Sequence, residues 1–242
     1  MTLNAEIQVL VLQLNKIEEI GSASFQFHPE LVTVDLSNNE LQHVQRKTFE
    51  AQKNLLNLNL SSNKLSVITR ETFLGLVNLE HLDISANNIA HLPSKVFQAM
   101  RRLIHLNLAH NRISTVAGDT FTGLSSLTFL NTLSIVTGQM TSPLSNLQVL
   151  DLSENRLSYI TKDALNDFSN ISSLNLSLTN IASVSNLSSL VKLKELFITN
   201  TKLTSLEFGM FRGIRSLHVI HIKQCKLLRS IHSEVFSDNP DL

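Results

Sequence analysis

The sequence has few of the residues that build disulfide frameworks and flexible linkers, and it has no long apolar run. Its one cysteine, Cys225, excludes an internal disulfide and a metal site made of several cysteines. Seven glycines and four prolines among 242 residues argue against a disordered or linker-rich chain. No apolar run is as long as a membrane span, which needs about 18 residues or more. The N-terminal segment lacks the features of a signal peptide.

An excess of charge and the motifs of catalysis are missing as well. The 20 Lys and Arg residues balance 20 Asp and Glu residues, which gives no reason to expect nucleic acid or an anionic membrane as a partner. The sequence contains no G-x-S-x-G, P-loop or H-E-x-x-H motif. We therefore expect no enzyme activity, no cofactor and no metal ion.

What the sequence does contain is leucine at a fixed interval. The segments LVTVDLSNNEL, LLNLNLSSNKL, LEHLDISANNI and LIHLNLAHNRI open at Leu31, Leu55, Leu79 and Leu103, with a constant spacing. Each segment reads L-x-x-L-x-L-x-x-N-x-L/I. The pattern begins at Ile7, returns at Leu147, and continues more loosely at Ile171, Leu193 and Leu217. A fixed period of this length indicates a stack of repeated units.

The alternation within L-x-x-L-x-L predicts a short, half-buried strand in each unit. One unit cannot bury its apolar side alone, so the units stack and their strands pair into a parallel sheet. The stretch between one motif and the next provides the crossover that parallel strands need. The chain resembles leucine-rich repeat proteins of the 24-residue class of animal extracellular receptors and matrix proteins. The resemblance implies an α/β horseshoe-shaped solenoid over residues 1–242, with a concave parallel β-sheet and a convex side of loops, 3-10 turns and short helices.

Two columns of side chains are expected to run through the stack. The amide at position 9 of each unit would bond backbone groups of adjacent turns. The predicted ladder is Asn15, Asn39, Asn63, Asn87, Asn111, Asn155, Thr179, Thr201 and Cys225, and it is less regular in its second half. Cys225 is thus expected to be a ladder substitute rather than a reactive thiol. A phenylalanine column is predicted to fill the convex side: Phe25, Phe49, Phe73, Phe97, Phe121, Phe211 and Phe236.

The rhythm fails between Leu103 and Leu147, where the interval falls four short of two full units. A frame from Leu130 puts Gly138 in the ladder slot, and we prefer it to a frame from Leu127. The predicted units open at residues 7, 31, 55, 79, 103, 130, 147, 171, 193 and 217, with an irregular joint at 127–146. We expect a shortened convex turn through Pro143 and a change of curvature there. Natural shortening and an engineered deletion both explain the deficit.

Positions 2, 3, 5, 7 and 8 of each unit are predicted to form the concave face, the usual binding face of such solenoids. Asp35, Asp83 and Asp151 share position 5, and we expect them to form lateral hydrogen bonds along the sheet. They are not expected to bind a metal ion, because ligands on one flat face do not enclose it. Phe197 is an aromatic residue at a normally polar position, and aromatics near cations are favoured in binding sites. The predicted partner-binding residues are His81, His105, His110, Lys194, Phe197, His218, His221 and Lys223. Ordinary solvated surface is the rival interpretation; partner binding through these histidines would depend on pH near about 6.5.

The ends and the sequons complete the expectations. The first strand carries Val9, Val11 and Leu14 on its concave side, which predicts a missing cap or preceding repeat. Neither end has a cysteine-bearing cap, so the chain resembles an internal fragment of a longer ectodomain. The sequence contains four N-x-S/T sequons for possible N-glycosylation, at Asn59, Asn170, Asn175 and Asn186.

The resemblance implies a protein-binding ectodomain module of a receptor, adhesion or innate-immune recognition protein. Its partner would be a protein ligand or co-receptor, with dimerisation as an option, and its location extracellular or at the cell surface. One alternative is an intracellular leucine-rich repeat scaffold for protein–protein interaction. Another is a recognition domain of a larger enzyme or receptor kinase.

Overall fold

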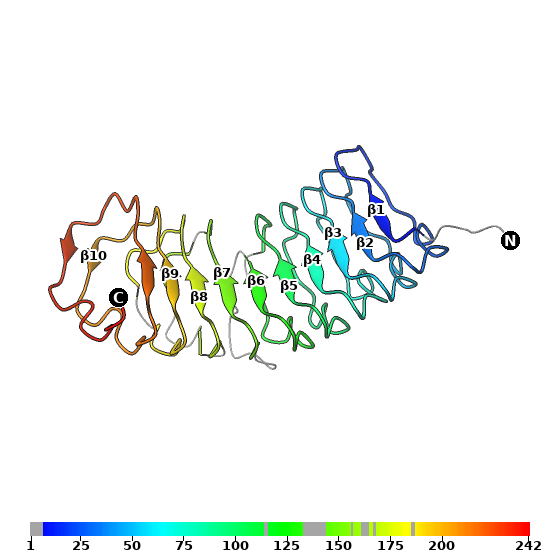
Figure 1. Cartoon of the computed structure of the whole chain (residues 1–242). Helices are drawn as coiled ribbons and strands as arrows, with labels where there is room; N and C mark the ends of the chain where they lie inside the picture. The colour runs from blue at the N-terminus through cyan, green and yellow to red at the C-terminus, as the bar shows by residue number, and fades with distance from the viewer. Residues whose placement is uncertain are drawn as a thin grey trace.

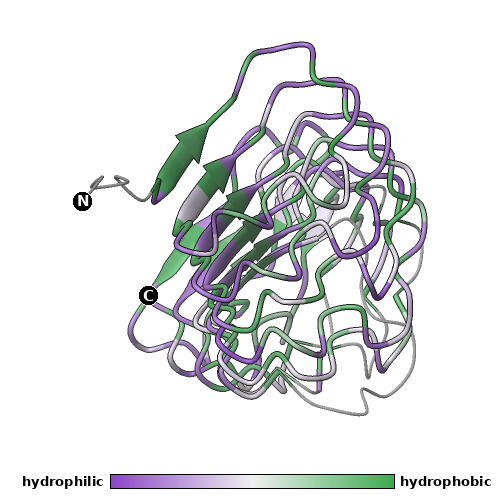
Figure 2. Cartoon of the chain, turned by 90° about the vertical axis from the view of Figure 1, so that its right-hand side faces the viewer, coloured by the Kyte–Doolittle hydropathy of each residue, from purple (hydrophilic) through white to green (hydrophobic). Residues whose placement is uncertain are grey.

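The computed structural model describes residues 7–113, 116–132, 144–155, 157–160, 165–166, 168–184 and 187–242. Short strands lie side by side along a shallow arc, from β1 near the N-terminus to the C-terminal end (Figure 1). Viewed along the stack, the strands form one side and the connecting loops the other (Figure 2). The chain is therefore a solenoid of parallel strands.

In the described residues, ten strands form one parallel sheet in the order β1-β2-β3-β4-β5-β6-β7-β8-β9-β11, and β10 pairs with β12 in a separate two-stranded sheet. Each main-sheet strand is three residues long and pairs with its neighbour in register. The strands are β1 Val9–Val11, β2 Thr33–Asp35, β3 Asn57–Asn59, β4 His81–Asp83, β5 His105–Asn107, β6 Phe129–Asn131, β7 Val149–Asp151, β8 Ser173–Asn175, β9 Glu195–Phe197, β10 Ser205–Leu206, β11 Val219–His221 and β12 Ser230–Ile231.

Strand alternation sets the two faces of the sheet. The middle residue of each strand from β2 to β9 is buried, as Val34 and Leu58 are, while its neighbours at positions 3 and 5 point to the concave side. Leucines and isoleucines at positions 1, 6 and 11 join the same continuous core. Burial along one stripe of every unit explains why the repeated apolar positions, rather than long apolar runs, build this fold.

The convex side consists of separate turns. Hydrogen bonds from a residue's N–H to the carbonyl three residues earlier occur at every second residue, as at Thr72, Leu74 and Leu76. A 3-10 helix would need such bonds at consecutive residues. Over the described residues no helix is present, so the helical part of the predicted α/β class is not confirmed.

The convex turns pack closely at one glycine. Gly75 has φ 99°, and a Cβ atom there would lie 2.3 Å from the carbonyl oxygen of Phe49 in the preceding unit. Only a residue without a side chain fits this backbone contact. Beside it runs the phenylalanine column, in which the ring centroids of Phe73 and Phe97 are 6.1 Å apart and those of Phe97 and Phe121 6.2 Å. Phe236 stacks on Phe211 but remains 39% exposed at the end of the column.

The ladder amides connect each unit to the one before it. Asn87 Nδ2 donates to the carbonyls of Leu60, Ile84 and Ser85, and its Oδ1 accepts from the Leu65 N–H. Asn39, Asn63 and Asn111 repeat this set of four bonds one unit apart. Asn15 lies exposed at the first unit, and within the described part of the chain its side chain bonds only carbonyls of its own turn.

The ladder changes chemistry after the joint. Asn155 donates to the carbonyls of Thr132, Leu152 and Ser153. Thr179 Oγ1 donates to the Leu176 carbonyl, and no other hydrogen bond of this side chain is present within the described residues. Cys225 Sγ donates to the Ile198 carbonyl and lies 3.3 Å from Thr201 Oγ1. Cys225 thus occupies a ladder position in the structure.

The predicted unit start at Leu130 is wrong. Strand β6 pairs Leu130 with Leu106 and with Leu150, which makes Leu130 the middle residue of its strand and Leu127 the first residue of its unit. The whole deficit therefore falls in one short unit, 127–146. Thr132 occupies the inward slot that is leucine or isoleucine in the regular units, and it is buried with no partner for its hydroxyl among the described residues. In the sequence, Thr132 at this slot and Ile135 at the ladder slot disfavoured the frame from Leu127. Ile135, Gly138 and Pro143 lie outside the described residues.

Candidate functional site

Stacked rings cross the middle of the concave face. His81, His105 and Phe129 occupy position 3 of their repeat units and are the first residues of β4, β5 and β6. We call these three residues the ring row. The centroids of His81 and His105 are 4.6 Å apart with planes 15° from parallel, and those of His105 and Phe129 are 5.5 Å apart. Burial and the neighbouring His81 charge lower the pKa of His105 below its ordinary value of 6.5. His105 is therefore neutral at physiological pH.

Phe129 belongs to this row although it was not among the predicted residues. The frame from Leu130 placed Phe129 outside its strand. A strict 24-residue count from Leu103 leads to Leu127, and that count would have put Phe129 at position 3 beside His105.

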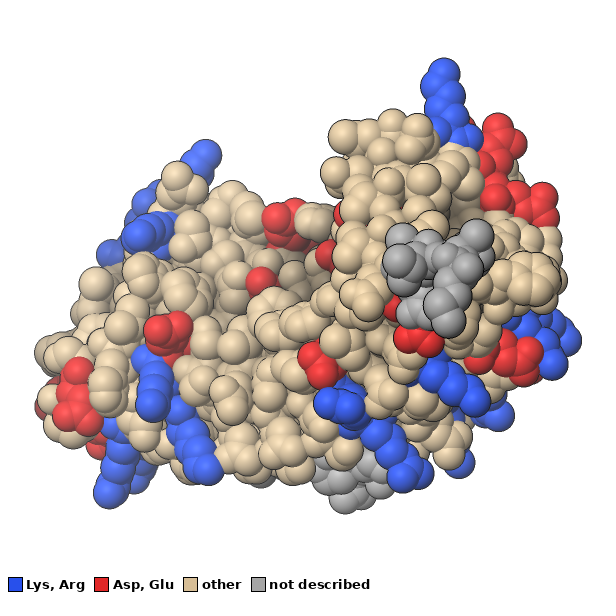
Figure 3. Space-filling model, turned by 45° about the vertical axis from the view of Figure 1, so that its right-hand side comes forward, with Lys and Arg blue, Asp and Glu red and all other residues tan. Residues whose placement is uncertain are grey.

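The ring row borders a hollow of about 290 Å³ in the concave surface over β2 to β6. Asp35 and Asp83 line it at position 5 of β2 and β4, on either side of β3. Small polar side chains, Thr33 and Asn57, line it at position 3, which leaves room beside the ring of His81. Figure 3 shows carboxylates within the hollowed middle of the visible surface, and Lys and Arg side chains near the lower edge and the two ends of the molecule.

The carboxylates of this row bond their neighbours laterally. Asp83 Oδ1 accepts from the N–H and the hydroxyl of Ser85, and its Oδ2 accepts from Asn107 Nδ2. Asp35 Oδ1 accepts from the Ser37 N–H, and no second hydrogen bond reaches Asp35 from the described residues. Within that same part of the chain, no group of three His, Cys, Asp or Glu side chains could hold a metal ion.

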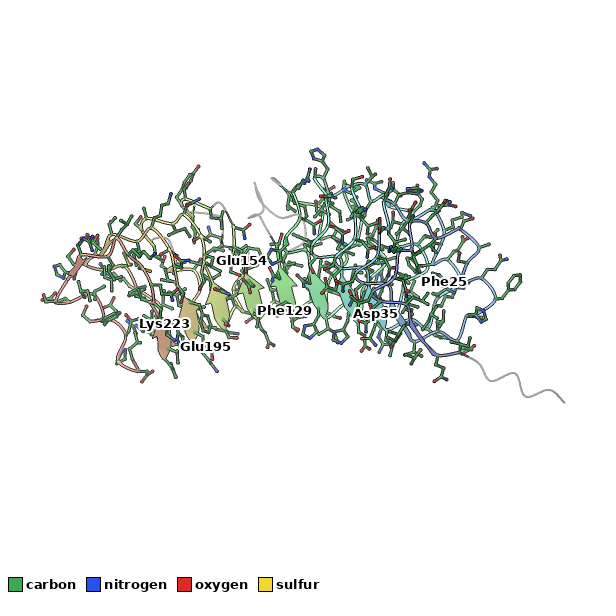
Figure 4. The ribbon with its side chains drawn as sticks, turned by 90° about the horizontal axis from the view of Figure 1, so that it is seen from above. Phe25, Asp35, Phe129, Glu154, Glu195 and Lys223 are labelled. Carbon is green, nitrogen blue, oxygen red and sulfur yellow. The ribbon has the colours of Figure 1, made fainter. Side chains whose placement is uncertain are left out.

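A second stacked pair lies at the C-terminal end of the sheet. Phe197 of β9 and His221 of β11 are paired in register, with centroids 4.8 Å apart and planes 9° from parallel. Lys194 and Lys223 are exposed near the ends of these strands, and Figure 4 places Lys223 and Glu195 at this end of the sheet. We call Phe197, His221, Lys194 and Lys223 the C-terminal patch. His218 is exposed beside it, one residue before β11.

His110 stands apart from both clusters. Its Nδ1 lies 3.4 Å from Glu154 Oε2. His110 holds position 8 of the unit before the shortened unit, and Glu154 holds position 8 of the unit after it, so this contact spans the shortened unit. Both have positive φ, 53° and 59°, as do the other described residues at this position. His110 is therefore a contact across the joint rather than a member of the ring row.

The first strand is exposed. Val9, Val11 and Leu14 are 61%, 54% and 75% exposed, and the nearest strand in Figure 2 is coloured hydrophobic. These are the apolar residues that the sequence predicted on the concave side of this strand.

Three of the four sequons lie in the described residues, and Asn186 lies outside them. Asn59 and Asn175 are position-5 residues of β3 and β8, on the concave face. Asn170 precedes β8, off the strands, and its Nδ2 donates to the Ser145 carbonyl. A glycan on Asn170 would therefore leave the concave face open.

Two family models match the chain. One, described as Leucine rich repeat, matches residues 29–89 and 78–134; the other, described as BspA type Leucine rich repeat region (6 copies), matches residues 119–242. Human leucine-rich repeat-containing protein 4C is 36% identical over 83 residues, which are 34% of this chain and 13% of that protein.

Solved structures agree in fold. An internalin (InlF) from Listeria monocytogenes matches with a TM-score of 0.74 and 20% identity over 98% of this chain and 65% of its own. TLR13, in a complex with ssRNA13, matches with a TM-score of 0.71 and 21% identity over 97% of this chain and 42% of its own. The present chain thus spans 65% or less of each of these relatives. Over the described residues, no helix has the length and hydrophobicity needed to cross a bilayer.

Proposed function

Because the chain belongs to the leucine-rich repeat family, whose fold mediates protein interaction, we propose that it binds a protein partner through its concave face. Binding is non-covalent and rests on shape and a few anchoring side chains. The module is part of the extracellular region of a receptor, adhesion or innate-immune protein.

The observation that carries this proposal is the C-terminal patch. Phe197 is half-buried on the concave side of β9, and His221 stacks on it from β11, so the two rings form one rigid platform. Aromatic side chains give large contact area at low entropic cost, and they are enriched at the centres of protein interfaces. Lys194 and Lys223 add positive charge beside the platform, where it would steer an acidic partner surface.

Protein is favoured over nucleic acid by the charge of the concave face. The TLR13 structure contains a single-stranded RNA, so this fold accommodates nucleic acid in another protein. In the present chain, the concave positions 3, 5, 7 and 8 of the described residues from β2 to β8 carry Asp35, Asp83, Asp151 and Glu154, and neither Lys nor Arg. A polyanion needs basic side chains along its path.

The test is a binding screen against an array of secreted and cell-surface proteins. The double variant Phe197→Ala/His221→Ala is expected to lose the partner of the unaltered chain while keeping its thermal stability. The matched control is Phe208→Ala/His232→Ala, which removes a second ring pair, 5.5 Å apart, outside the main sheet. A partner that binds the first variant as tightly as the unaltered chain would place the contact elsewhere.

The proposed extracellular location has its own test. Fused to a secretion signal and expressed in animal cells, the chain is expected to leave the cell folded and to carry a glycan at Asn170. Retention as an unfolded, unglycosylated chain would instead support the intracellular scaffold.

A further inference from the structure

The hollow over β3 has the shape and charge of a site for one planar cation. Its floor is β3, with Asn57 at position 3 and Asn59 at position 5. Asp35 and Asp83 occupy position 5 on the strands at either side of β3. Adjacent strands are about 4.8 Å apart, so a group above β3 would have a carboxylate within reach on both sides.

The ring of His81 closes the third side. One face of this ring stacks on His105 of β5, so its opposite face is turned toward β3. The residue paired with His81 on β3 is Asn57, which carries no ring and whose amide donates to Thr33 Oγ1. A flat group above Asn57 would therefore extend the ring row by one more layer.

Apart from the titratable rings of His81 and His105, the charged side chains that line this space are carboxylates. Asp83 is held by Ser85 and Asn107, which fixes the carboxylate in place, and Asp35 has hydrogen-bonding capacity left after its one bond from Ser37. At the concave positions of the described strands β2 to β6, no Lys or Arg offsets these two charges. In Figure 3 the Lys and Arg atoms lie near the lower edge and the two ends of the molecule, away from its hollowed middle.

We propose that the hollow over β3 binds an arginine side chain presented by an extended segment of the protein partner, with the guanidinium stacked on His81 between Asp35 and Asp83. Arginine fits better than lysine, because a guanidinium is planar, stacks on rings and bonds carboxylates with two parallel N–H groups. The lowered pKa of His105 keeps the next ring in the row neutral at physiological pH, so that ring does not repel the cation. This inference rests on the proposed protein-binding function and names the chemistry of part of its partner.

The test uses the whole 242-residue chain, produced without glycans because Asn59 borders the site. The probes are two blocked peptides, Ac-Gly-Gly-Arg-Gly-Gly-NH2 and its counterpart with neutral citrulline, and the readout is the NMR signal of the histidine rings. The arginine peptide is expected to shift the ring signals of His81 and of His105, which stacks on it, saturably at about millimolar concentration. The His105 signal is the readout where His81 is replaced. The citrulline peptide is expected to bind about tenfold more weakly, because it keeps the shape and loses the charge.

Three variants make the test specific. Asp83→Asn and His81→Thr are each expected to weaken the arginine peptide about tenfold. Both substitutions preserve the fold, since the chain itself has Asn at position 5 of β3 and β5 and Thr at position 3 of β2. Asp151→Asn is the matched control. It removes a charge at the same position of β7, outside the hollow, and is expected to change binding less than about twofold.

Equal binding of the two peptides, or no loss in the Asp83→Asn variant, would overturn the inference. If the arginine peptide does not bind while a protein partner still depends on Phe197 and His221, the inference fails and the proposed function stands. If partner binding ignores the whole concave face, the proposed function fails first.

Discussion

Replacing Asn87 by alanine tests whether the ladder amides hold the stack together. The side chain makes three donated bonds and one accepted bond, at 2.9 to 3.1 Å, and is buried. The three carbonyls keep other donors, namely Asn63 Nδ2 for Leu60, Asn111 Nδ2 for Ile84 and the Ser62 N–H for Ser85. Among the described residues, the Leu65 N–H has no other acceptor.

The expected magnitude follows from these four groups. An orphaned buried N–H costs about 1–3 kcal/mol, and each of three lost bonds costs about 0.5–1 kcal/mol when its carbonyl keeps another donor. Asn87→Ala is therefore expected to lower the free energy of unfolding by about 2.5–6 kcal/mol. Asn15→Ala is the matched control at the same position of the first unit. Asn15 is exposed and bonds two carbonyls only, so its loss is expected to cost under about 1 kcal/mol.

The assay is urea unfolding, with hydrogen exchange at the Leu65 amide as a local readout. A constant slope against urea is required, because stacked repeats can unfold in parts. Equal effects of Asn87→Ala and Asn15→Ala, both under about 1 kcal/mol, would refute the reasoning.

Three further outcomes are expected. Gly75→Ala should lower the free energy of unfolding in urea by about 2 kcal/mol or more, because the new Cβ would lie 2.3 Å from the Phe49 carbonyl oxygen and φ is positive. Gly21→Ala is its control, because the new Cβ would lie 3.6 Å from the nearest atom. It should change the free energy of unfolding by less than about 1 kcal/mol. The pKa of His105 is lower in the folded chain than in the unfolded chain, so on acidification the unfolded chain binds a proton at this ring first. The stability that neutral His105 contributes is therefore present above about pH 6.5 and is lost as the pH falls below that value. Ring NMR titration should show His105 titrating below 6.5, and His81→Asn should raise its pKa; an unchanged pKa would leave burial as the sole cause. Leu130→Ala should cost about 2–5 kcal/mol in urea because Leu130 is the buried middle residue of β6, and a loss under about 1 kcal/mol would contradict the register of that strand.

The regular half of the fold could be predicted from the sequence because residues at the same position of successive units have the same structural role. Once Leu58 and Asn63 are assigned to core and ladder, a shift of one repeat unit assigns Leu82 and Asn87, and repetition makes chance agreement improbable. The concave histidines His81 and His105 followed from the same count, since residues at one position of adjacent units must lie beside each other in a parallel sheet.

The joint could not be predicted in the same way. Choosing between frames required weighing Thr132 at a core slot and Ile135 at the ladder slot, which the frame from Leu127 gives, against the shorter unit that follows from a frame at Leu130. The sequence favoured the frame from Leu130. The structure instead buries the threonine hydroxyl and keeps the in-register pairing of all three residues of β6. Phe129 was missed as a consequence. The hollow beside His81 was also beyond the sequence, because it depends on the direction in which a ring face is turned.

The central claim is that the concave face binds the partner, and photo-crosslinking tests it most directly. A photoreactive p-benzoylphenylalanine is placed at Phe197 in one variant and at Phe208, 58% exposed outside the main sheet, in another. We expect the variant with the photoreactive residue at position 197 to form a covalent adduct with the partner, and the variant with it at position 208 to form none. An adduct from position 208 alone would contradict it.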